Sequence, residues 1–121
     1  MPIKSYKDLI VWQKSMNLVT EIYKLSKTFP KSEIFGLTSQ IKRSAVSIPS
    51  NIAEGSRRGS KKNFRHFLLN AYGSGAELET QLDIAEERQF ASSNELDRPM
   101  DLSDEIMRML NRMTKKLNSE A

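Results

Sequence analysis

Cysteine is absent from this sequence of 121 residues, and histidine occurs once, as His66. Without cysteine the chain can form neither disulfide bonds nor thiolate metal sites, so its stability must come from an apolar core. A single histidine also leaves few of the imidazole ligands that zinc and copper sites use. We therefore expect no metal ion and no other cofactor.

Long apolar stretches are missing as well. No run approaches the roughly 20 apolar residues that span a bilayer, so a membrane is not an expected partner. Residues 1–5 lack the apolar segment of a signal peptide, which makes the cytoplasm the expected compartment. Neither a run of alternating apolar and polar residues nor an Asn-Gly or Asp-Gly turn signal occurs, so β-strands are not expected.

Recognisable catalytic motifs do not occur either. The sequence has no Gly-rich phosphate loop, nucleophile elbow or zinc-binding pattern. A di-metal carboxylate bundle needs a glutamate three positions before a histidine, but Asn63 stands there. A helical ribonuclease of the HEPN type needs an arginine separated from its histidine by four to six residues, where this chain has Gly59, Ser60 and Lys61. We expect no catalytic residues and no enzymatic activity.

What the sequence does contain is four segments in which apolar residues recur at the three- and four-residue steps of a helix. The first helix is predicted from about Ser5, which resembles the start of a capping box, to Ser26. It ends before Pro30, because the residue preceding a proline leaves helical geometry. Its predicted core stripe contains Leu9, Trp12, Met16, Val19 and Tyr23. The aromatic residues Trp12, Tyr23 and Tyr72 follow helical stripes, so we expect them in core or interface packing, with the core favoured, rather than on a base-stacking surface.

The second predicted helix carries the apolar series Leu37, Ile41, Ala45, Ile48 and Ile52 and contains Pro49. A proline removes one backbone donor and clashes with the carbonyl four residues earlier, at a cost of about 3 kcal/mol in an ordinary helix. Two arrangements remain open, a kinked helix or two shorter helices that meet. The small polar neighbours of Pro49 favour the kink.

The third helix is predicted to begin after the N-cap Ser60, and its apolar stripe keeps a four-three spacing over three heptads. For the fourth helix, Ser92 and Glu95 resemble a capping box, but Pro99 favours a short first turn followed by a helix from about residue 99. Four amphipathic helices joined by short connections predict an all-α, antiparallel, up-down-up-down four-helix bundle. Residues 1–121 are expected to form a single domain.

The formal net charge of +4 is unevenly distributed along the chain. Residues 42–76 carry 7 positive side chains and 1 negative one, a net charge of +6. Residues 77–121 carry 6 positive and 11 negative side chains, a net charge of −5. This asymmetry points to an anionic partner, to contact between copies of the chain, or to both.

The densest positive stretch, residues 57–65, lies at the turn where the third helix begins. Free N–H groups and the helix dipole at such a position also favour an anion. Binding of the phosphate backbone of RNA or DNA is the functional interpretation, and a solvated loop is the alternative. The candidate nucleic-acid-binding residues are the basic side chains of this stretch and two further back on the second helix: Lys42, Arg43, Arg57, Arg58, Lys61, Lys62 and Arg65.

A second group of polar residues is interpreted as structural. Asn51 and Glu54 lie three positions apart beside the apolar face of the second helix, and Glu77 takes a similar place in the third. A carboxylate at such a place needs a basic partner when it is buried. We expect a polar network that fixes helix register or a subunit contact, rather than a pair of catalytic carboxylates.

Several blocks of the sequence match a known pattern. The most specific is Ser-Ile-Pro-Ser-Asn-Ile-Ala-Glu-Gly at residues 47–55. The others are Val-Trp-Gln-Lys at 11–14, Phe-Pro at 29–30 followed by Glu33, Phe-Gly-Leu-Thr-Ser-Gln-Ile at 35–41, and Gly-Ser at 73–74 leading to Glu-Leu-Glu-Thr-Gln-Leu at 77–82. Over nearly the whole chain, the sequence resembles the bacterial four-helix-bundle family of 23S rRNA intervening-sequence proteins. Only the fourth helix, with Pro99, departs from a smooth helical pattern.

The resemblance implies properties that composition does not show. It implies a homopentameric barrel of four-helix bundles, and many members of the family are encoded within intervening sequences of 23S rRNA genes. A related branch serves as the accessory protein of diversity-generating retroelements, where a basic surface engages nucleic acid and a reverse transcriptase. Carried over to this chain, Pro49, Asn51, Glu54 and Gly55 shape the second helix and its packing, and the basic residues of 57–65 form the nucleic-acid surface.

Two hypotheses from different classes follow. The first is a non-enzymatic, pentameric accessory protein that binds nucleic acid non-specifically and has a reverse transcriptase or another protein as a further partner. The second is a structural or protein-interaction scaffold with no nucleic-acid role, in which the basic and acidic parts of neighbouring subunits pair. Phosphate binding weakens steeply with salt, whereas a scaffold held by charge dissociates in salt.

Overall fold

The computed structural model describes residues 5–120, and within that range the chain forms helices and no strand. The α-helices are α1 (Ile10–Ser26), α2 (Leu37–Arg57), α3 (Lys61–Glu87) and α4 (Ser93–Glu120). Two short 3-10 helices, η1 (Tyr6–Asp8) and η2 (Lys31–Glu33), precede α1 and α2. The prediction of an all-α chain with four helices is therefore confirmed. Residues 1–4 and 121, which include most of the segment considered for a signal peptide, lie outside the described range.

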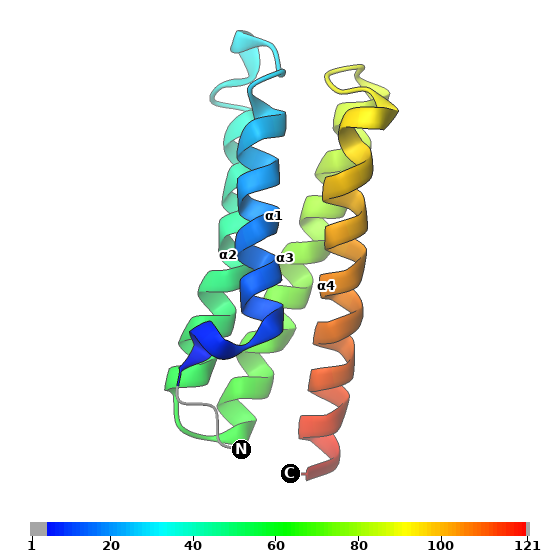
Figure 1. Ribbon diagram of the computed structural model, residues 1–121. Helices are drawn as coiled ribbons and strands as arrows, with labels where there is room; N and C mark the ends of the chain where they lie inside the picture. Colours follow the sequence, from blue (N-terminus) through cyan, green and yellow to red (C-terminus); the bar gives the residue numbers. More distant parts are fainter. Residues whose placement is uncertain (1–4, 121) are drawn as a thin grey trace.

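The four helices pack side by side, with each helix against two others. In Figure 1 the chain rises through α1, returns along α2, rises again through α3 and descends along α4. Contacts join α1 to α2, α2 to α3, α3 to α4 and α4 back to α1. Two ion pairs tie α1 to α4, Lys14 to Glu105 at 3.1 Å and Glu21 to Arg98 at 3.3 Å. Among the helices of residues 5–120, none has both the length and the apolarity needed to cross a bilayer.

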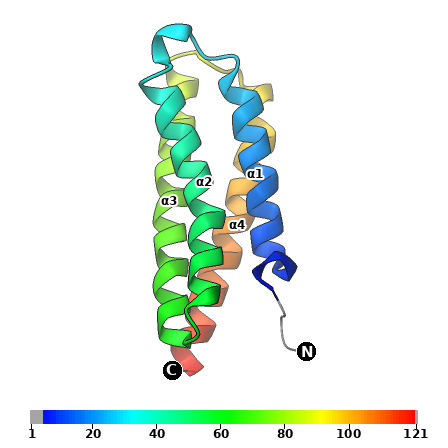
Figure 2. The same cartoon turned by 90° about the vertical axis from the view of Figure 1, so that its left-hand side faces the viewer.

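The two ends of the bundle differ in their content. One end carries η1, the α2–α3 turn and the last turns of α4, and the other carries η2 and the α3–α4 turn, as both views show (Figures 1 and 2). Between them, aliphatic side chains from all four helices form a fully buried core: Leu18, Ile22, Ile41, Ile48, Ile52, Leu68, Leu78, Leu82, Ile106 and Leu110. The predicted apolar stripe of α3 lies in this core, with Gly75 leaving room for the side chain of Met107.

The buried face of α1 is not the predicted one. The helix buries Val11, Leu18, Ile22 and Leu25, together with the small Ser15, at the same helical spacing. The predicted stripe lies one position further along, which turns it by about 100° around the helix and toward α2. There Trp12 and Val19 are half-buried, whereas Met16 and Tyr23 are 42% and 44% exposed.

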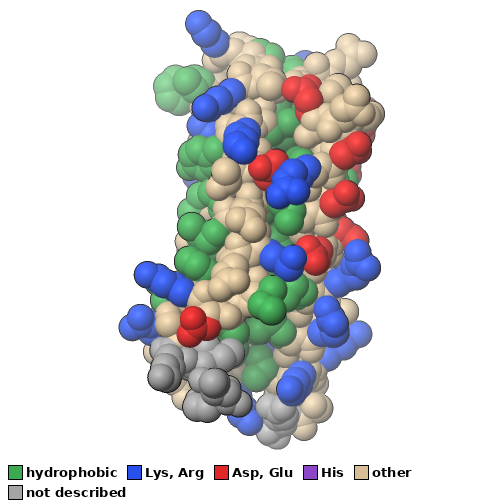
Figure 3. All heavy atoms as spheres, viewed as in Figure 1, with side chains coloured by type: hydrophobic (Ala, Val, Ile, Leu, Met, Phe, Trp, Pro, Cys, Tyr) green, Lys and Arg blue, Asp and Glu red, His purple; other side chains and the backbone are tan. Residues whose placement is uncertain are grey.

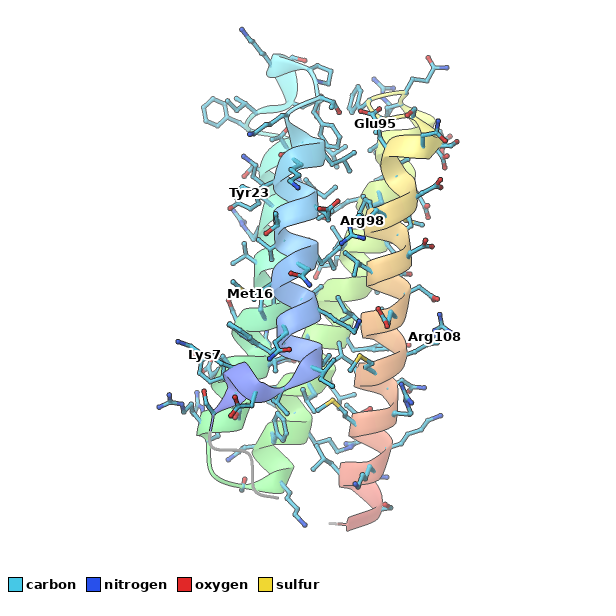
Figure 4. The ribbon with its side chains drawn as sticks, in the orientation of Figure 1. Lys7, Met16, Tyr23, Glu95, Arg98 and Arg108 are labelled. Atoms are coloured by element: carbon cyan, nitrogen blue, oxygen red, sulfur yellow. The ribbon has the colours of Figure 1, made fainter. Side chains whose placement is uncertain are left out.

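The favoured alternative, that the aromatic residues lie in the core, is wrong for Tyr23 and also for Tyr72, which is 38% exposed. Packing of these two residues in an interface stays a prediction. Only Trp12 is partly buried and packs against the core. Figure 4 shows Met16 and Tyr23 on one side of α1, away from α4. A helix with two apolar stripes thus has one in the core and one on the surface.

The start of α1 also differs from the prediction, although its end at Ser26 agrees. Ser5 does act as an N-cap, but its hydroxyl accepts a hydrogen bond from Lys7 N at 3.2 Å and caps η1 rather than α1. Leu9 is extended, with ψ 125°, and separates the two helices. The side-chain amide of Gln13 reaches back to the carbonyl oxygen of Lys7 at 2.8 Å and holds η1 against α1.

The second helix is continuous through its proline. Because α2 runs from Leu37 to Arg57 with Pro49 inside it, the alternative of two shorter helices is wrong. Side chains beside the proline bind the backbone of the preceding turn, Ser50 Oγ to Val46 O and Asn51 Nδ2 to Ser47 O, both at 2.8 Å. These bonds support the turn that the missing N–H of Pro49 weakens. The kink at this point stays a prediction.

The prediction that the fourth helix begins near residue 99 is wrong, because α4 begins at Ser93 and includes Pro99. The capping box of Ser92 and Glu95 forms in both directions. Ser92 N donates to Glu95 Oε1 at 2.9 Å, and Glu95 N donates to Ser92 Oγ at 3.3 Å. This box holds the first turn in helical geometry, so the proline is accommodated seven residues into the helix with its side chain buried.

Candidate nucleic-acid interface

The centre of the candidate interface is the tight turn between α2 and α3. Gly59 has φ +85°, a left-handed conformation that suits glycine and lets the chain reverse at once after α2. The predicted N-cap of α3 is confirmed, because Ser60 Oγ accepts a hydrogen bond from Asn63 N at 3.1 Å. Four exposed basic residues sit on this turn: Arg57, Arg58, Lys61 and Lys62.

The two arginines of the turn are partly held by neighbouring side chains. Arg57 lies over the ring of Tyr6, with its guanidinium carbon 5.5 Å from the ring centroid. Arg58 forms an ion pair with Glu54 at 2.6 Å and lies over the ring of Phe67 at 5.0 Å. Both members of the ion pair are about half exposed, and exposed pairs of this kind are weak. These contacts orient the side chains of Arg57 and Arg58, and both side chains remain exposed to solvent.

Arg65, the last basic residue of the predicted stretch, has a different environment. It is half-buried, and its Nε donates a hydrogen bond to the backbone oxygen of Thr114 at 3.1 Å. Thr114 is only 5% exposed and belongs to α4. One edge of the guanidinium is therefore committed to joining α3 and α4.

Lys42 and Arg43 are not brought into this cluster. They precede Arg57 by about 15 residues on the same helix, which corresponds to about 22 Å along its axis. Lys42 lies over the ring of Tyr23 at 4.8 Å, and the exposed Arg43 lines a cleft between α2 and α3. They form a separate basic group toward the other end of α2.

The fold adds basic residues that the sequence reasoning missed. Because the chain returns along α4, the end of that helix lies beside the start of α3, and the Arg65–Thr114 bond joins the two. Lys7 of η1 lies at the same end, as Figure 4 shows. Figure 3 shows Lys and Arg side chains at this lower end of the molecule. We call the following exposed set the basic end: Lys7, Arg57, Arg58, Lys61, Lys62, Arg112, Lys115 and Lys116.

Of the residues predicted to be structural, the uncharged ones are buried or half-buried in α2, whereas the two carboxylates are exposed. Asn51 belongs to a polar network across the α2–α3 contact, in which its amide binds Ser47 Oγ at 3.0 Å and Ser47 Oγ pairs with Ser74 Oγ at 2.8 Å. Gly55 is buried against α3, where an added Cβ would lie 2.6 Å from Phe67 Cβ. Pro49 is buried within α2, as already described.

The two predicted structural carboxylates lie outside this network. Glu54 is exposed and pairs with Arg58, so it takes no part in the network around Asn51, and a role for it in a subunit contact stays a prediction. Glu77 is exposed and lines the α2–α3 cleft of about 320 Å³ together with Arg43 and several serine and glutamine residues. The network at this contact is therefore built from uncharged groups.

Comparison with known proteins identifies the family. The family model named 23S rRNA-intervening sequence protein matches residues 7–112. This chain belongs to that family. The match includes the α2–α3 turn and leaves out Lys115 and Lys116 of the basic end.

A solved structure that is similar to this chain supports the fold. It is the crystal structure of a protein of unknown function from the S23 ribosomal protein family of Bacteroides thetaiotaomicron, with a TM-score of 0.81 and 26% sequence identity. The likeness covers 88% of this chain and 99% of that chain. No match was found among curated proteins. The comparisons thus establish the family and the four-helix fold.

Proposed function

We propose that this member of the 23S rRNA-intervening sequence family is a non-enzymatic, oligomeric protein that binds RNA or DNA non-specifically through its basic end. The observation that supports the proposal most strongly is the convergence of basic residues from three separate segments on one end of the bundle. Those segments are η1, the α2–α3 turn and the last turns of α4. Such clustering attracts a polyanion and needs no group that reads a base.

The geometry of the α2–α3 turn supports phosphate as the chemistry recognised. Lys61 and Lys62 stand in the first turn of α3, where backbone N–H groups and the helix dipole add positive potential. Within the described residues, the basic end includes the exposed ion pair of Arg58 with Glu54, and all of its basic side chains are exposed. Contact with about five phosphates would give a log-log salt slope of about −4 to −5 on duplex DNA.

The proposed assembly rests on the family resemblance. The bundle, with its antiparallel up-down-up-down helices, is proposed to form a homopentamer in the cytoplasm. A reverse transcriptase or another protein is proposed as a further partner on the same basis.

The proposal is tested by binding of the purified protein to labelled structured RNA and duplex DNA over a salt series, with its mass measured in the same buffers. We expect micromolar or tighter binding, a steep salt slope and a particle of about five subunits. Binding that does not change with salt, or the absence of binding at low salt, contradicts the nucleic-acid role. A monomeric mass contradicts the proposed assembly.

A protein-interaction scaffold is the second candidate. It is favoured by apolar side chains that remain exposed on α1 and α2, among them Met16, Tyr23 and Val46. An intact oligomer that binds neither RNA nor DNA at low salt would support this function in place of the first.

A further inference from the structure

The α2–α3 cleft is a polar site that the proposed binding of nucleic acid at the basic end does not use. It opens on the surface between two helices that lie side by side, as Figure 2 shows. Its volume is about 320 Å³, and pockets of this size and above hold small molecules in other proteins. Every residue that lines it is polar or charged: Gln40, Arg43, Ser44, Ser47, Ser74, Glu77 and Gln81.

The cleft has a fixed position because a hydrogen-bonded contact joins its two helices. Ser47 Oγ and Ser74 Oγ lie 2.8 Å apart, and the amide of Asn51 binds Ser47 Oγ at 3.0 Å. From this contact the lining residues follow at three- and four-residue steps on each helix: Gln40, Ser44 and Ser47 on α2, and Ser74, Glu77 and Gln81 on α3. Polar groups held on two packed helices are preorganised, which lowers the entropic cost of binding a ligand.

Two polar groups of the cleft lack a hydrogen-bond partner. Ser44 is only 7% exposed, and its hydroxyl makes no hydrogen bond to the part of the chain that the structure describes. The Oε1 atom of Gln81 is buried and is likewise without a partner there. Rotation of this side-chain amide turns the oxygen toward the cleft. Because buried polar groups in folded proteins are nearly always hydrogen-bonded, these two groups point to a bound molecule that supplies their partners.

The two charged residues of the cleft do not pair with each other. Arg43 and Glu77 are both exposed, and neither forms an ion pair within residues 5–120. A guanidinium group binds a carboxylate through two parallel hydrogen bonds, and a carboxylate accepts hydrogen bonds from an ammonium group. A cation and an anion that line one cleft without neutralising each other suit a ligand that carries both charges.

An apolar surface extends the cleft along α3. This extension, of about 390 Å³, shares Gln40, Glu77 and Gln81 with the cleft and adds Ala76, Thr80 and Ile84. The side chain of Ile84 is 43% exposed, so an apolar group can pack against it. A ligand held by its charged end in the cleft would therefore place an attached hydrocarbon chain on this surface, where burial of apolar area is favourable.

We propose that the α2–α3 cleft binds a free α-amino acid with an aliphatic side chain. The carboxylate of the amino acid pairs with Arg43 and accepts a hydrogen bond from the hydroxyl of Ser44. Its ammonium group donates to the carboxylate of Glu77 and to Oε1 of Gln81. Its side chain packs on the extension at Ile84. One ligand of this class thus gives each unpaired group of the cleft a partner, and it is bound and released without a covalent step.

Other classes of ligand satisfy only part of the cleft. Inorganic phosphate pairs with Arg43 but is repelled by Glu77, and a cation is repelled by Arg43 in turn. The phosphate backbone of a nucleic acid meets the same repulsion, because residues 67–87 contain five carboxylates and no lysine or arginine. An uncharged apolar molecule leaves the hydroxyl of Ser44 and the amide of Gln81 without partners. The site is therefore distinct from the basic end in both position and chemistry.

The first test is isothermal titration calorimetry of the purified full-length protein with L-leucine. We expect saturable binding of one L-leucine per chain. Three analogues each remove one recognised group: N-acetyl-L-leucine lacks the ammonium charge, L-leucinamide lacks the carboxylate, and glycine lacks the aliphatic side chain. Each analogue should bind at least about tenfold more weakly than L-leucine, since each leaves a group of the cleft without its partner.

The second test connects each charge of the ligand to its residue. Glu77→Gln and Arg43→Gln keep the approximate shape of the side chain, and each should weaken L-leucine binding about tenfold or more. Glu77→Gln should bind L-leucine and N-acetyl-L-leucine about equally, because the group that distinguishes them has lost its partner. Arg43→Gln should do the same for L-leucine and L-leucinamide. The matched controls are Glu87→Gln and Arg88→Gln, exposed positions outside the cleft that should keep wild-type affinity.

Each other outcome overturns the assignment. No saturable binding up to about 1 mM L-leucine means that the cleft does not recognise this class of ligand. Equal binding of L-leucine and N-acetyl-L-leucine by the wild-type protein shows that Glu77 does not select an ammonium group. Binding that survives both cleft substitutions, in variants that circular dichroism shows to be folded, places the site elsewhere. Salt-dependent binding of RNA or DNA is measured separately, so neither result decides the other.

Discussion

Arg65 donates a hydrogen bond from Nε to the backbone oxygen of Thr114, 3.1 Å away and 49 positions later in the chain. The bond joins the first turns of α3 to the last turns of α4. It thereby sets Lys115 and Lys116 on the same end of the bundle as Lys61 and Lys62. Arg65 is therefore better described as the residue that organises the basic end than as one of its phosphate contacts.

Replacing Arg65 by alanine is expected to lower the free energy of unfolding by about 1–2 kcal/mol. A hydrogen bond from a charged donor contributes about 1.5–3 kcal/mol, and partial exposure of this one reduces the value. Urea denaturation followed by circular dichroism measures the change. Arg112→Ala, an exposed arginine of the same helix end, should change the value by less than about 0.5 kcal/mol. Equal effects of the two substitutions would contradict a structural role for the Arg65–Thr114 bond.

Removing two cations of the basic end is expected to reduce the salt dependence of nucleic-acid binding. The double substitution Lys62→Ala and Lys116→Ala should lower the magnitude of the log-log salt slope on duplex DNA by about 1.8, since each lost phosphate contact contributes about 0.9. The matched control is Lys31→Ala with Arg88→Ala, which removes the same charge at the opposite end of the bundle. If the control reduces the slope as much, binding follows net charge and not the basic end.

Two glycines are expected to respond to alanine in opposite directions. Gly55→Ala would set a Cβ 2.6 Å from Phe67 Cβ and 3.3 Å from Phe64 O, so the contact between α2 and α3 must open. Overpacking of this kind costs about 1–3 kcal/mol. Gly73→Ala meets no atom and should stabilise the helix by up to about 1 kcal/mol. Both are measured by urea denaturation at one fixed protein concentration, and a stabilising Gly55→Ala would refute the close packing.

The capping box of α4 provides a further test. Ser92→Ala removes the hydroxyl that accepts from Glu95 N, and the loss of an N-cap costs about 1 kcal/mol. Because Pro99 already weakens the second turn, we expect the first turns of α4 to exchange their amide hydrogens faster in this variant. Asn94→Ala, an exposed neighbour for which no side-chain bond is seen, should leave both stability and exchange nearly unchanged.

The sequence was sufficient to predict the helices but not every face that they bury. On α1, Trp12, Met16, Val19 and Tyr23 each follow a buried residue by one position, so two apolar stripes have the same spacing. Periodicity measures the spacing and not the direction of the core, which depends on where the other helices lie. This is why the predicted core stripe of α1 lies partly on the surface of the bundle, toward α2.

Local sequence rules did not predict where a helix begins when two of them conflicted. At α4 the proline rule predicted a late start, and the capping box at Ser92 predicted an early one. The early start at Ser93 is observed because the capping box forms hydrogen bonds in both directions across the first turn of α4. The following turns are stabilised by packing of one side of α4 against the core. At Pro49 the proline rule conflicted with the continuous apolar series of α2, and the structure has a continuous helix.

The candidate site was predicted in part. The α2–α3 turn was found because its cations are contiguous in sequence, whereas Lys7, Arg112, Lys115 and Lys116 are brought to it only by the fold. Lys42 and Arg43 were included because they are close in sequence, although one helix separates them from the turn by about 22 Å. Charge runs therefore locate the centre of a patch, and topology determines its extent.

The location of the basic end at one tip of the bundle has a consequence for affinity. If the copies of the proposed homopentamer lie side by side in the same orientation, every basic end lies on the same rim of the assembly. A single RNA that reaches two basic ends binds the second at a high effective concentration. The affinity of the assembly for this RNA therefore exceeds the affinity of one subunit by a factor much larger than the number of subunits. Weak individual contacts would then suffice for tight binding, and control of assembly would also be control of nucleic-acid binding.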